Sequence, residues 1–529
     1  MKTKVSSTLR QVVVAAILSC ISLAASPVQS AEADVEDITT KVSEYRTQHE
    51  REILLEYFEL LRLPNYSPNR ADIGRNAEHI VSMMERRGID ARILDAGVGA
   101  PAVYGERMTP GATKSVLFYV HYDGQPVVAE NWNSDPYEPV IKTGYESRGG
   151  KVVPFDELTF PIDPNLRIFA RSTSDDKAPV IGLLTAIDAL RDAGISPSVN
   201  MKFFFEGEEE RGSPHLGEML DRFGHLLDAD ALLFLDGPVD QSGRKKLSFG
   251  VRGPVGFDIT IYGPDRPLHS GHYGNFAPNP ISMLVHLLAG MRDETGRVLI
   301  EGFYDAVVPP SEAELAAIAE LPDLEAQLME ELALGRRESP DMRYQEAILW
   351  PALNFKGIRA GEVGKDSRNA IVPTASASVG YRMVPDQTPA LLKELTNAHI
   401  EAQGYHIVTE DPDAETRRAH PKVAKVTWTD YGYGPVRTPV DAPESRALIG
   451  LFEDLFYDDV ILIPSSGGSL PIWYFKEALD IPLIMLPIAN YDNNQHAENE
   501  NIRIGNLWDG IEIYAAVIAD YGKRLKIEN

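Results

Sequence analysis

Apolar positions along the first half of the chain follow two periods, and each period predicts one kind of element. Apolar residues at helical spacing predict helices over residues 34–63, 73–87 and 180–190. Short apolar runs predict strands at 91–94, 102–105, 115–120, 166–170, 199–205 and 231–235. This alternation of strands and helices predicts an α/β fold, with a mainly parallel sheet covered by helices on both faces.

The pattern changes near residue 250. Alternating positions at 257–262 and 375–383 predict strands, helices are expected at 280–291 and 389–403, and residues 309–345 are acidic and helical in composition. The first pattern resumes with a helix at 445–456, strands at 460–463 and 482–487, and a last helix at 507–525. We therefore expect a catalytic domain of residues 34–251 and 431–529, interrupted by a smaller α+β domain, residues 252–430.

The N-terminus has the composition of a secretory signal. Lys2, Lys4 and Arg10 precede the apolar run Val12–Ala25, and Ala31-Glu32-Ala33 fits a cleavage site. We expect a signal peptide over residues 1–33 and no stable membrane span after its removal. An uncleaved anchor and lipidation of Cys20 are the alternatives.

The cysteine content limits the compartments in which the protein is expected, and the net charge limits its expected binding partners. Cys20 is the only cysteine, so the processed chain would have no disulfide and no thiolate site. Export without disulfides predicts a secreted protein, in a bacterial periplasm or beyond. The formal net charge of −27 opposes binding to nucleic acid and to anionic membranes, which require basic patches.

A dense acidic stretch follows one predicted strand. Phe203–Phe205 form its apolar end, and Glu206 and Glu208–Glu210 follow, with Arg211 as the one positive neighbour. Carboxylates this close raise one another's pKa unless a positive charge compensates them. A bound divalent cation would do so, whereas the alternative is a solvated acidic loop.

Polar residues at strand ends favour the metal interpretation. His121, Glu209, Glu210 and Asp236 each follow a predicted strand. Ligands of open α/β sheets bind beyond the carboxyl ends of the strands, so these side chains are expected to meet.

The full set of motifs resembles a known superfamily. In chain order it comprises His121-x-Asp123, Asp175-Asp176-Lys177, Glu209-Glu210, Asp236 and His496-Ala497-Glu498-Asn499-Glu500. It is similar to the co-catalytic di-zinc metallopeptidases and amidohydrolases, which include carnosinase-type dipeptidases, carboxypeptidase G, aminoacylase and succinyl-diaminopimelate desuccinylases. The carnosinase-type branch is the most similar, over nearly all of the processed chain.

The resemblance implies two metal ions. His121, Asp175 and Asp236 would hold one and Asp175, Glu210 and His496 the other, with Asp175 bridging and a cis peptide at Asp175–Asp176. Imidazole and carboxylate donors suit two Zn²⁺ ions, with Mn²⁺ or Co²⁺ as substitutes. Asp123 is expected to orient the His121 ring.

The resemblance also implies roles in catalysis and binding. Glu209 matches the general base, which would activate a water bridging the two metals. His269, in Leu268-His269-Ser270-Gly271, matches an oxyanion donor that the inserted lid and dimerisation domain of a partner subunit supplies, so a homodimer is expected. Arg382 matches a residue that binds the substrate carboxylate, and Gly468 and Ser469 match a substrate loop.

One departure from the pattern affects the expected substrate. Carnosinase-type dipeptidases carry Arg-Glu before the glycine pair, where this chain has Ser465-Ser466. The expected activity is hydrolysis of dipeptides or short peptides with a free carboxylate. The alternatives are an amidohydrolase of N-acyl amino acids and, in another class, a periplasmic binding protein without catalysis.

Overall fold

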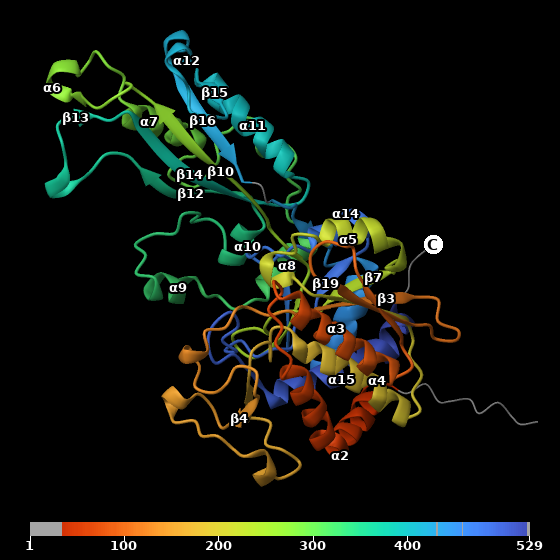
Figure 1. Cartoon of the computed structure of the whole chain (residues 1–529). Coiled ribbons are helices and arrows are strands. Elements are labelled where there is room, and N and C mark those ends of the chain that lie inside the picture. The colour runs from red at the N-terminus through yellow and green to blue at the C-terminus, as the bar shows by residue number, and fades with distance from the viewer. Residues whose placement is uncertain (1–33, 430–431, 458, 526–529) are drawn as a thin grey trace, which may run out of the picture.

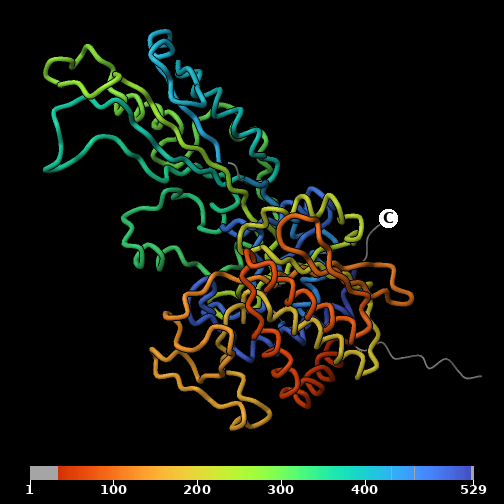
Figure 2. The backbone as a smooth tube through the Cα atoms, viewed as in Figure 1, coloured from red at the N-terminus to blue at the C-terminus, as the bar shows by residue number. Residues whose placement is uncertain are grey.

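The computed structural model describes residues 34–429, 432–457 and 459–525, and the predicted signal peptide lies outside them. The chain forms a larger lobe, which contains an eight-stranded sheet, and an elongated smaller lobe, which contains a five-stranded sheet (Figure 1). The N-terminal and C-terminal parts of the chain both run through the larger lobe, while a central part forms the smaller lobe (Figure 2). Within the described ranges, no helix combines the length and the apolar character that crossing a membrane requires.

The sheet of the larger lobe has the order β1-β2-β6-β3-β7-β19-β8-β18. Its central strands β6, β3, β7 and β19 are parallel, and β1 and β2 are antiparallel at one edge. The predicted α/β class with a mainly parallel sheet is confirmed. The bounds are β1 (Asp90–Leu94), β2 (Ala102–Arg107), β3 (Ser115–His121), β6 (Asn200–Glu206), β7 (Ala231–Phe234), β8 (Lys245–Ser248), β18 (Val460–Ile463) and β19 (Leu483–Met485).

Helices cover both faces of this sheet because its strands are apolar on both sides. Phe203 and Phe205 of β6 pack with the helices of one face, and Phe204 between them packs with those of the other. The first face is covered by α2 (Val35–Leu61), α3 (Arg70–Glu85), α4 (Lys177–Asp192), α13 (Pro443–Phe456) and α15 (Ile504–Arg524). The second is covered by α5 (Leu216–Phe223) and α14 (Trp473–Leu479).

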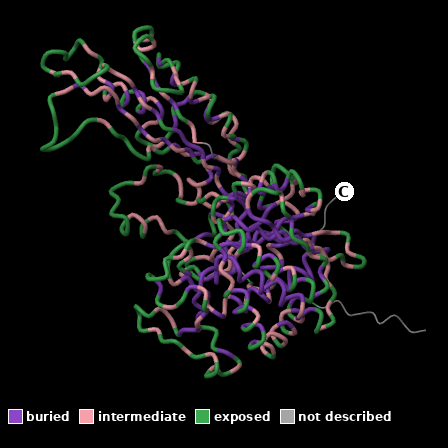
Figure 3. The backbone as a smooth tube through the Cα atoms, in the orientation of Figure 1, coloured by how far each residue is buried: buried purple, intermediate pink, exposed green. Residues whose placement is uncertain are grey.

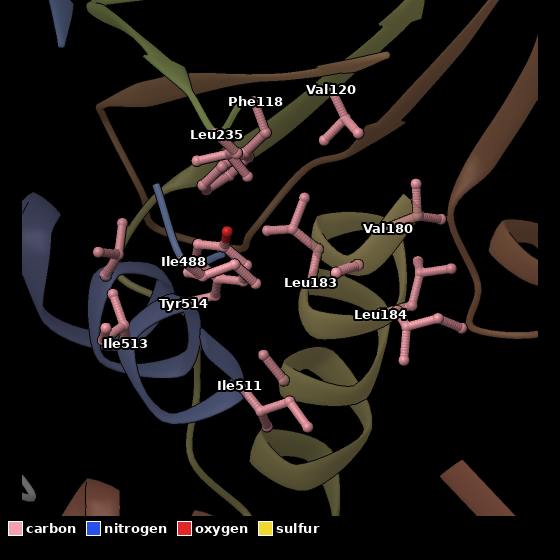
Figure 4. Packing of buried hydrophobic residues seen from close by; sticks show 14 of the residues in the cluster. Phe118, Val120, Val180, Leu183, Leu184, Leu235, Ile488, Ile511, Ile513 and Tyr514 are labelled. Atoms are coloured by element: carbon pink, nitrogen blue, oxygen red, sulfur yellow. The ribbon is translucent and has the colours of Figure 1, made fainter. Parts of the chain in front are cut away.

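The main core lies between the sheet and α4 and α15. Leu183 of α4 and Tyr514 of α15 face Phe118 of β3 across this layer (Figure 4). Buried segments are concentrated in the larger lobe, whereas much of the smaller lobe is exposed (Figure 3). The strands after which the predicted site residues follow therefore lie in the more buried part of the molecule.

The predicted loop 131–165 contains some regular structure. It includes β4 (Val140–Lys142) and the short turns η2 (Glu146–Arg148) and η3 (Phe155–Glu157), and η1 (Ala129–Asn131) lies at its start. Strand β4 joins β5 (Arg167–Phe169) and β20 (Asn501–Arg503) in a separate small sheet. This sheet ties the loop to a segment more than three hundred residues further on.

The smaller lobe has the sheet order β12-β14-β10-β16-β15. Alternate residues of β14 are buried, which leaves one face for helices. The elements are β10 (Gly253–Tyr262), β11 (Leu268–His269), α6 (Ser270–Tyr273), α7 (Pro280–Met291), β12 (Ala352–Arg359), η6 (Gly364–Asp366), β13 (Ala370–Ile371), β14 (Thr374–Met383), α11 (Pro389–Ala402), β15 (His406–Val408), α12 (Ala414–Ala419) and β16 (Val423–Trp428).

The acidic segment between α7 and β12 packs partly on the larger lobe. It contains α8 (Glu312–Ala319), α9 (Glu325–Glu331) and α10 (Tyr344–Ile348). Ile318 and Leu349 pack against Ile461 of β18, and Glu314 pairs with Arg437 at 3.1 Å. Arg437 lies on β17 (Val436–Arg437), which pairs with β9 (Gly250–Val251) at the junction of the lobes. The domain division at 252 and 430 stays a prediction, and residues 312–349 do not pack as part of the smaller lobe alone.

Candidate active site

Three neighbouring strands bring the first group of site residues together. His121 is the last residue of β3, Glu209 and Glu210 lie in the turn η4 (Glu209–Arg211) after β6, and Asp236 follows β7. Because β6, β3 and β7 are adjacent and parallel, their carboxyl ends lie at one edge of the sheet.

Two further loops complete the group. Asp175 lies just before α4, and His496 lies in the loop between β19 and β20. Asp175 Oδ1 is 2.8 Å from His121 Nε2, and its Oδ2 is 3.2 Å from His496 Nε2. His496 Nε2 is also 3.1 Å from Glu210 Oε2. Asp175 therefore lies between the two histidines, and its peptide bond to Asp176 is cis, as the resemblance predicts.

The donor atoms form two groups, each with its atoms within 4.8 Å of one another. One consists of His121, Glu209 and Asp236, and the other of Asp175, Glu210 and His496. The group of Asp175, Glu210 and His496 is identical to one predicted ligand set. The other group differs from the second predicted set because it contains Glu209 in place of Asp175. Two clusters of imidazole and carboxylate donors fit a pair of Zn²⁺-like cations.

Without a cation, this concentration of charge is unfavourable. Burial and the neighbouring Asp175 raise the pKa of Asp236 to about 7. Burial, with Asp236 and Glu210, raises the pKa of Glu209 well above its usual value, although His121 acts in the opposite direction. Hydrogen bonds to Asp175 and Glu210 raise the pKa of His496 to about 10. Divalent cations would relieve this repulsion between carboxylates.

Asp123 connects three residues of the site. Its Oδ1 accepts the backbone N–H of Glu209 at 3.0 Å, and its Oδ2 accepts that of Glu210 at 3.2 Å. Its Oδ1 also lies 3.3 Å from His121 Nδ1. The contact with the His121 ring is the one that the sequence led us to expect, and the support for the Glu209–Glu210 turn is additional.

Glu500 is a buried residue that the sequence reasoning missed. Its Oε1 accepts the backbone N–H groups of Ser174 and Asp175 at 2.8 and 3.0 Å. Its Oε2 accepts the N–H of Ser172 and an Arg171 guanidinium N–H, both at 2.8 Å. Glu500 thus joins the loop of Asp175 to the loop of His496. Its position in the His496 motif was the available signal.

A cavity of about 250 Å³ opens beside the donor clusters, and Ser469 in its lining is contacted by Arg382 of the smaller lobe. Its lining includes Asp175, Glu209, Glu210, Asp236, Ser469 and His496. Arg382 of β14 donates to Ser469 Oγ at 2.6 Å, so two predicted substrate-binding residues contact each other.

Arg252 is a second guanidinium near Ser469, and the sequence reasoning missed it. Its backbone N–H donates to the Gly468 carbonyl at 3.2 Å, and its side chain donates to the Gly467 carbonyl. Burial and the nearby Arg382 lower the pKa of Arg252. Among the residues that the structure describes, no carboxylate pairs with Arg252 or Arg382, so both are available to an anionic ligand.

His269 does not join this group within one chain. It is exposed, its ring lies 4.5 Å from that of His272, and its Nδ1 accepts the Gly271 N–H. It directly precedes α6, at the far end of the smaller lobe (Figure 1). Any contribution to catalysis would have to be made to another copy of the chain.

The sheet, the convergent donors and the adjoining cavity define a metal-dependent hydrolase. A profile of the Peptidase family M20/M25/M40 matches residues 117–520, and the chain belongs to this family. It is accordingly a metal-dependent hydrolase of peptide bonds. The alternative of a binding protein without catalysis is set aside on this ground.

Individual relatives cover most of the chain. The Cys-Gly metallodipeptidase dug1 of Schizosaccharomyces pombe is 25% identical over 443 residues, 82% of this chain and 86% of the relative. The Beta-Ala-His dipeptidase of Homo sapiens is 25% identical over 429 residues, 79% of this chain and 76% of the relative. The crystal structure of the M20 family metallo-carboxypeptidase Sso-CP2 from Sulfolobus solfataricus superposes with a TM-score of 0.68 and 27% identity, covering 89% of this chain and 99% of that one.

These comparisons correct the predicted location. The Cys-Gly metallodipeptidases of S. pombe and Saccharomyces cerevisiae that match this chain give no support to export, and the prediction of a secreted, periplasmic protein is wrong. A few positive residues before a short apolar run are a compositional signal, which does not identify export by itself. The minor alternative of an anchor at Cys20 belonged to the same prediction and is withdrawn with it.

Proposed function

We propose that the protein hydrolyses the amide bond of dipeptides or short peptides that carry a free carboxylate. The relatives are named as dipeptidases and a metallo-carboxypeptidase, which supports this class of substrate. The observation that carries the proposal is the meeting of Arg382 and Ser469 at the rim of the cavity beside the donor clusters. A guanidinium binds a carboxylate through paired N–H donors, and Arg252 nearby adds a second positive charge.

Two Zn²⁺ ions are the proposed cofactors, with Mn²⁺ or Co²⁺ as substitutes. His121, Asp175 and Asp236 would hold one ion and Asp175, Glu210 and His496 the other, which agrees with the placement of Asp175 between the two histidines. When bound, the ions would lower the pKa of a water molecule and polarise the scissile carbonyl.

Glu209 is the proposed general base. It takes a proton from water as the oxygen attacks the carbonyl carbon, and it then gives that proton to the leaving nitrogen as the C–N bond breaks. Asp123 supports this function because it accepts the backbone N–H of Glu209 and so fixes the turn that carries the carboxylate. Arg382 and Ser469 hold the substrate carboxylate, and Gly468 leaves its side of the loop open because no atom lies within 4 Å of where its Cβ would stand.

We further propose that the functional unit is a homodimer in which His269 of the partner subunit donates a hydrogen bond to the developing oxyanion. Its exposure and its distance from the cavity of its own chain support this arrangement.

An amidohydrolase of N-acyl amino acids is the second candidate function. Ser465 and Ser466 precede the glycine pair and offer no carboxylate to a free ammonium group. An uncharged acyl group would therefore be accepted at least as well as a free amine on this side.

One substrate panel separates the two candidates. The zinc-loaded protein is assayed on a dipeptide, its N-acetylated form and its C-terminally amidated form. The proposal expects the amide to be the poorest substrate, and faster cleavage of the acetylated form would favour the amidohydrolase. Equal rates on the amidated and free-carboxylate forms would remove the proposed role of the guanidinium pair, and no hydrolysis at all would refute both candidates.

A further inference from the structure

A second polar cavity lies away from the active-site cavity. Its volume is about 340 Å³, and it lies between the turn at residues 143–150 and the segment 490–503. The side chains that matter for its chemistry are Tyr145, Arg148, Asn165, Arg167, Asp492 and Arg503. None of them is a proposed metal ligand or substrate-binding residue.

The cavity is positively charged, although the whole chain carries a formal charge of −27. Three guanidinium groups face one carboxylate, Asp492, and this carboxylate is already bound to Arg167 at 2.7 Å. In the part of the chain that the structure describes, Arg148 and Arg503 form no ion pair. Arg503 Nε is moreover buried without a hydrogen-bond acceptor. A buried donor without an acceptor is unfavourable, so a bound anion would be stabilised here.

Two of the three guanidinium groups, those of Arg148 and Arg167, are held in place before any ligand binds. Arg167 donates to Asn501 Oδ1 at 2.8 Å and lies 5.3 Å from the centre of the Tyr145 ring. Arg148 lies 5.5 Å from the centre of the same ring. Asn501 also donates to the Tyr145 hydroxyl at 2.8 Å, which fixes the ring. Such preorganisation lowers the entropic cost of binding.

We propose that this cavity binds an oxyanion of the phosphate class, either free phosphate or the phosphate group of a small ester. Planar guanidinium forks match phosphate oxygens, and three of them around one cavity suit a group with more than one negative charge. The volume leaves room for an organic substituent beside the phosphate.

The cavity is connected to the active site through one loop. Asp492 and Arg503 lie on either side of His496 in sequence, and the Arg503 backbone N–H donates to Asn490 Oδ1 at 2.7 Å. The Asp492 carbonyl accepts hydrogen bonds from Arg167 and from the Tyr145 hydroxyl. An anion that contacts Arg167 and Arg503 therefore stabilises both ends of the loop that carries His496, and it acts as an effector of the hydrolase.

Binding is tested directly, without turnover, on the full-length, metal-loaded protein. Inorganic phosphate and phenyl phosphate are titrated by equilibrium dialysis into the parent, Arg503→Gln, Arg148→Gln and Arg266→Gln. Arg266 is an exposed arginine of the smaller lobe, paired with its neighbour Asp265, so its variant is a control for the change in net charge. We expect Arg503→Gln to weaken binding by about tenfold or more, as for the loss of one charge-assisted hydrogen bond, and Arg266→Gln to bind as the parent does.

The remaining outcomes separate this cavity from the metal centre. Phosphate that binds only to the metals would compete with the peptide substrate and have equal affinity for the parent and Arg503→Gln, which would overturn the proposal. Tighter binding of phenyl phosphate would identify an ester as the ligand, and tighter binding of inorganic phosphate would identify the free ion. If Arg503→Gln does not fold, the exposed Arg148→Gln decides, and unchanged binding there refutes the site. If phosphate changes the turnover of the parent but not that of Arg148→Gln, the cavity is coupled to the active site. An identical response of the parent and Arg148→Gln would exclude this coupling.

Discussion

The donor side chains of the larger lobe and the basic side chains of the smaller lobe are held in place to very different degrees. Glu209 and Asp175 are buried, and Asp123 and Glu500 hold the backbone beside them through several hydrogen bonds. Arg382 and His269 are exposed, and Arg382 has one side-chain contact across the lobes, to Ser469. The proposed base and bridging ligand are therefore fixed by one core, whereas the proposed carboxylate anchor and oxyanion donor depend on how the smaller lobe is placed, within the chain or in a partner.

Removal of the metal should have the largest effect on activity. It should also show most clearly that the two lobes respond differently. We expect a chelator to abolish hydrolysis and Zn²⁺ to restore it, because the ions supply the polarising charge. Hydrogen exchange should increase in the loops around Asp175 and His496 and stay unchanged in the smaller lobe. Activity that survives chelation, in protein shown by elemental analysis to be free of transition metals, would contradict the proposed centre.

Glu209→Gln should cause the second-largest loss of activity. The substitution keeps the shape of the side chain and removes the base, so we expect kcat to fall by about 10²–10⁴-fold. The zinc content should remain that of the parent, and this is measured on the same preparation. A variant that keeps its turnover would exclude Glu209 as the base.

His269→Ala tests whether the smaller lobe acts in another copy. We expect a loss of kcat of about 10²–10³-fold, typical of one oxyanion donor, with no change in zinc content. Mixing it with Glu209→Gln should restore part of the activity, because one site of a mixed dimer would combine an intact Glu209 with an intact His269. His272→Ala is the matched control. Absence of recovery in subunits shown to exchange would argue against the shared site.

Arg382→Met should have the smallest effect of the four. We expect KM for peptides with a free carboxylate to rise by about 10- to 100-fold, as for the loss of a charge-assisted hydrogen bond, with little change in kcat. The KM of C-terminally amidated peptides should not change, because they lack the anion that Arg382 is proposed to bind. An equal rise for both kinds of substrate would show that Arg382 supports the loop and not the carboxylate.

Elements with strong local signals could be predicted from the sequence. The helix predicted at 280–291 has these same bounds in the structure, because Asn279 caps it and Pro280 starts it. Strands β4, β12 and β20 were missed, since their own patterns are short or largely exposed, and β20 also pairs with a strand more than three hundred residues away. The packing of residues 312–349 on β18 was missed for a similar reason, because acidic helices do not reveal which surface their few apolar residues contact.

The same distinction applies to the site. His121, Glu209, Glu210 and Asp236 could be located because each follows a strand, and the topology then required them to meet. The roles of Glu500 and Arg252 were not identified, because their partners lie more than two hundred residues away in sequence, and only Glu500 stands in a recognised motif. Their contribution is visible only in three dimensions.

The hydrogen bond between Arg382 and Ser469 has a consequence for the length of peptide that can be cut. It places the proposed carboxylate anchor beside a cavity of about 250 Å³ whose lining also includes Glu209, the proposed base. A substrate anchored there has room for only a short stretch of chain between its terminus and the bond under attack. We therefore expect the protein to cut bonds near the carboxyl end of short peptides and not those in the interior of long chains.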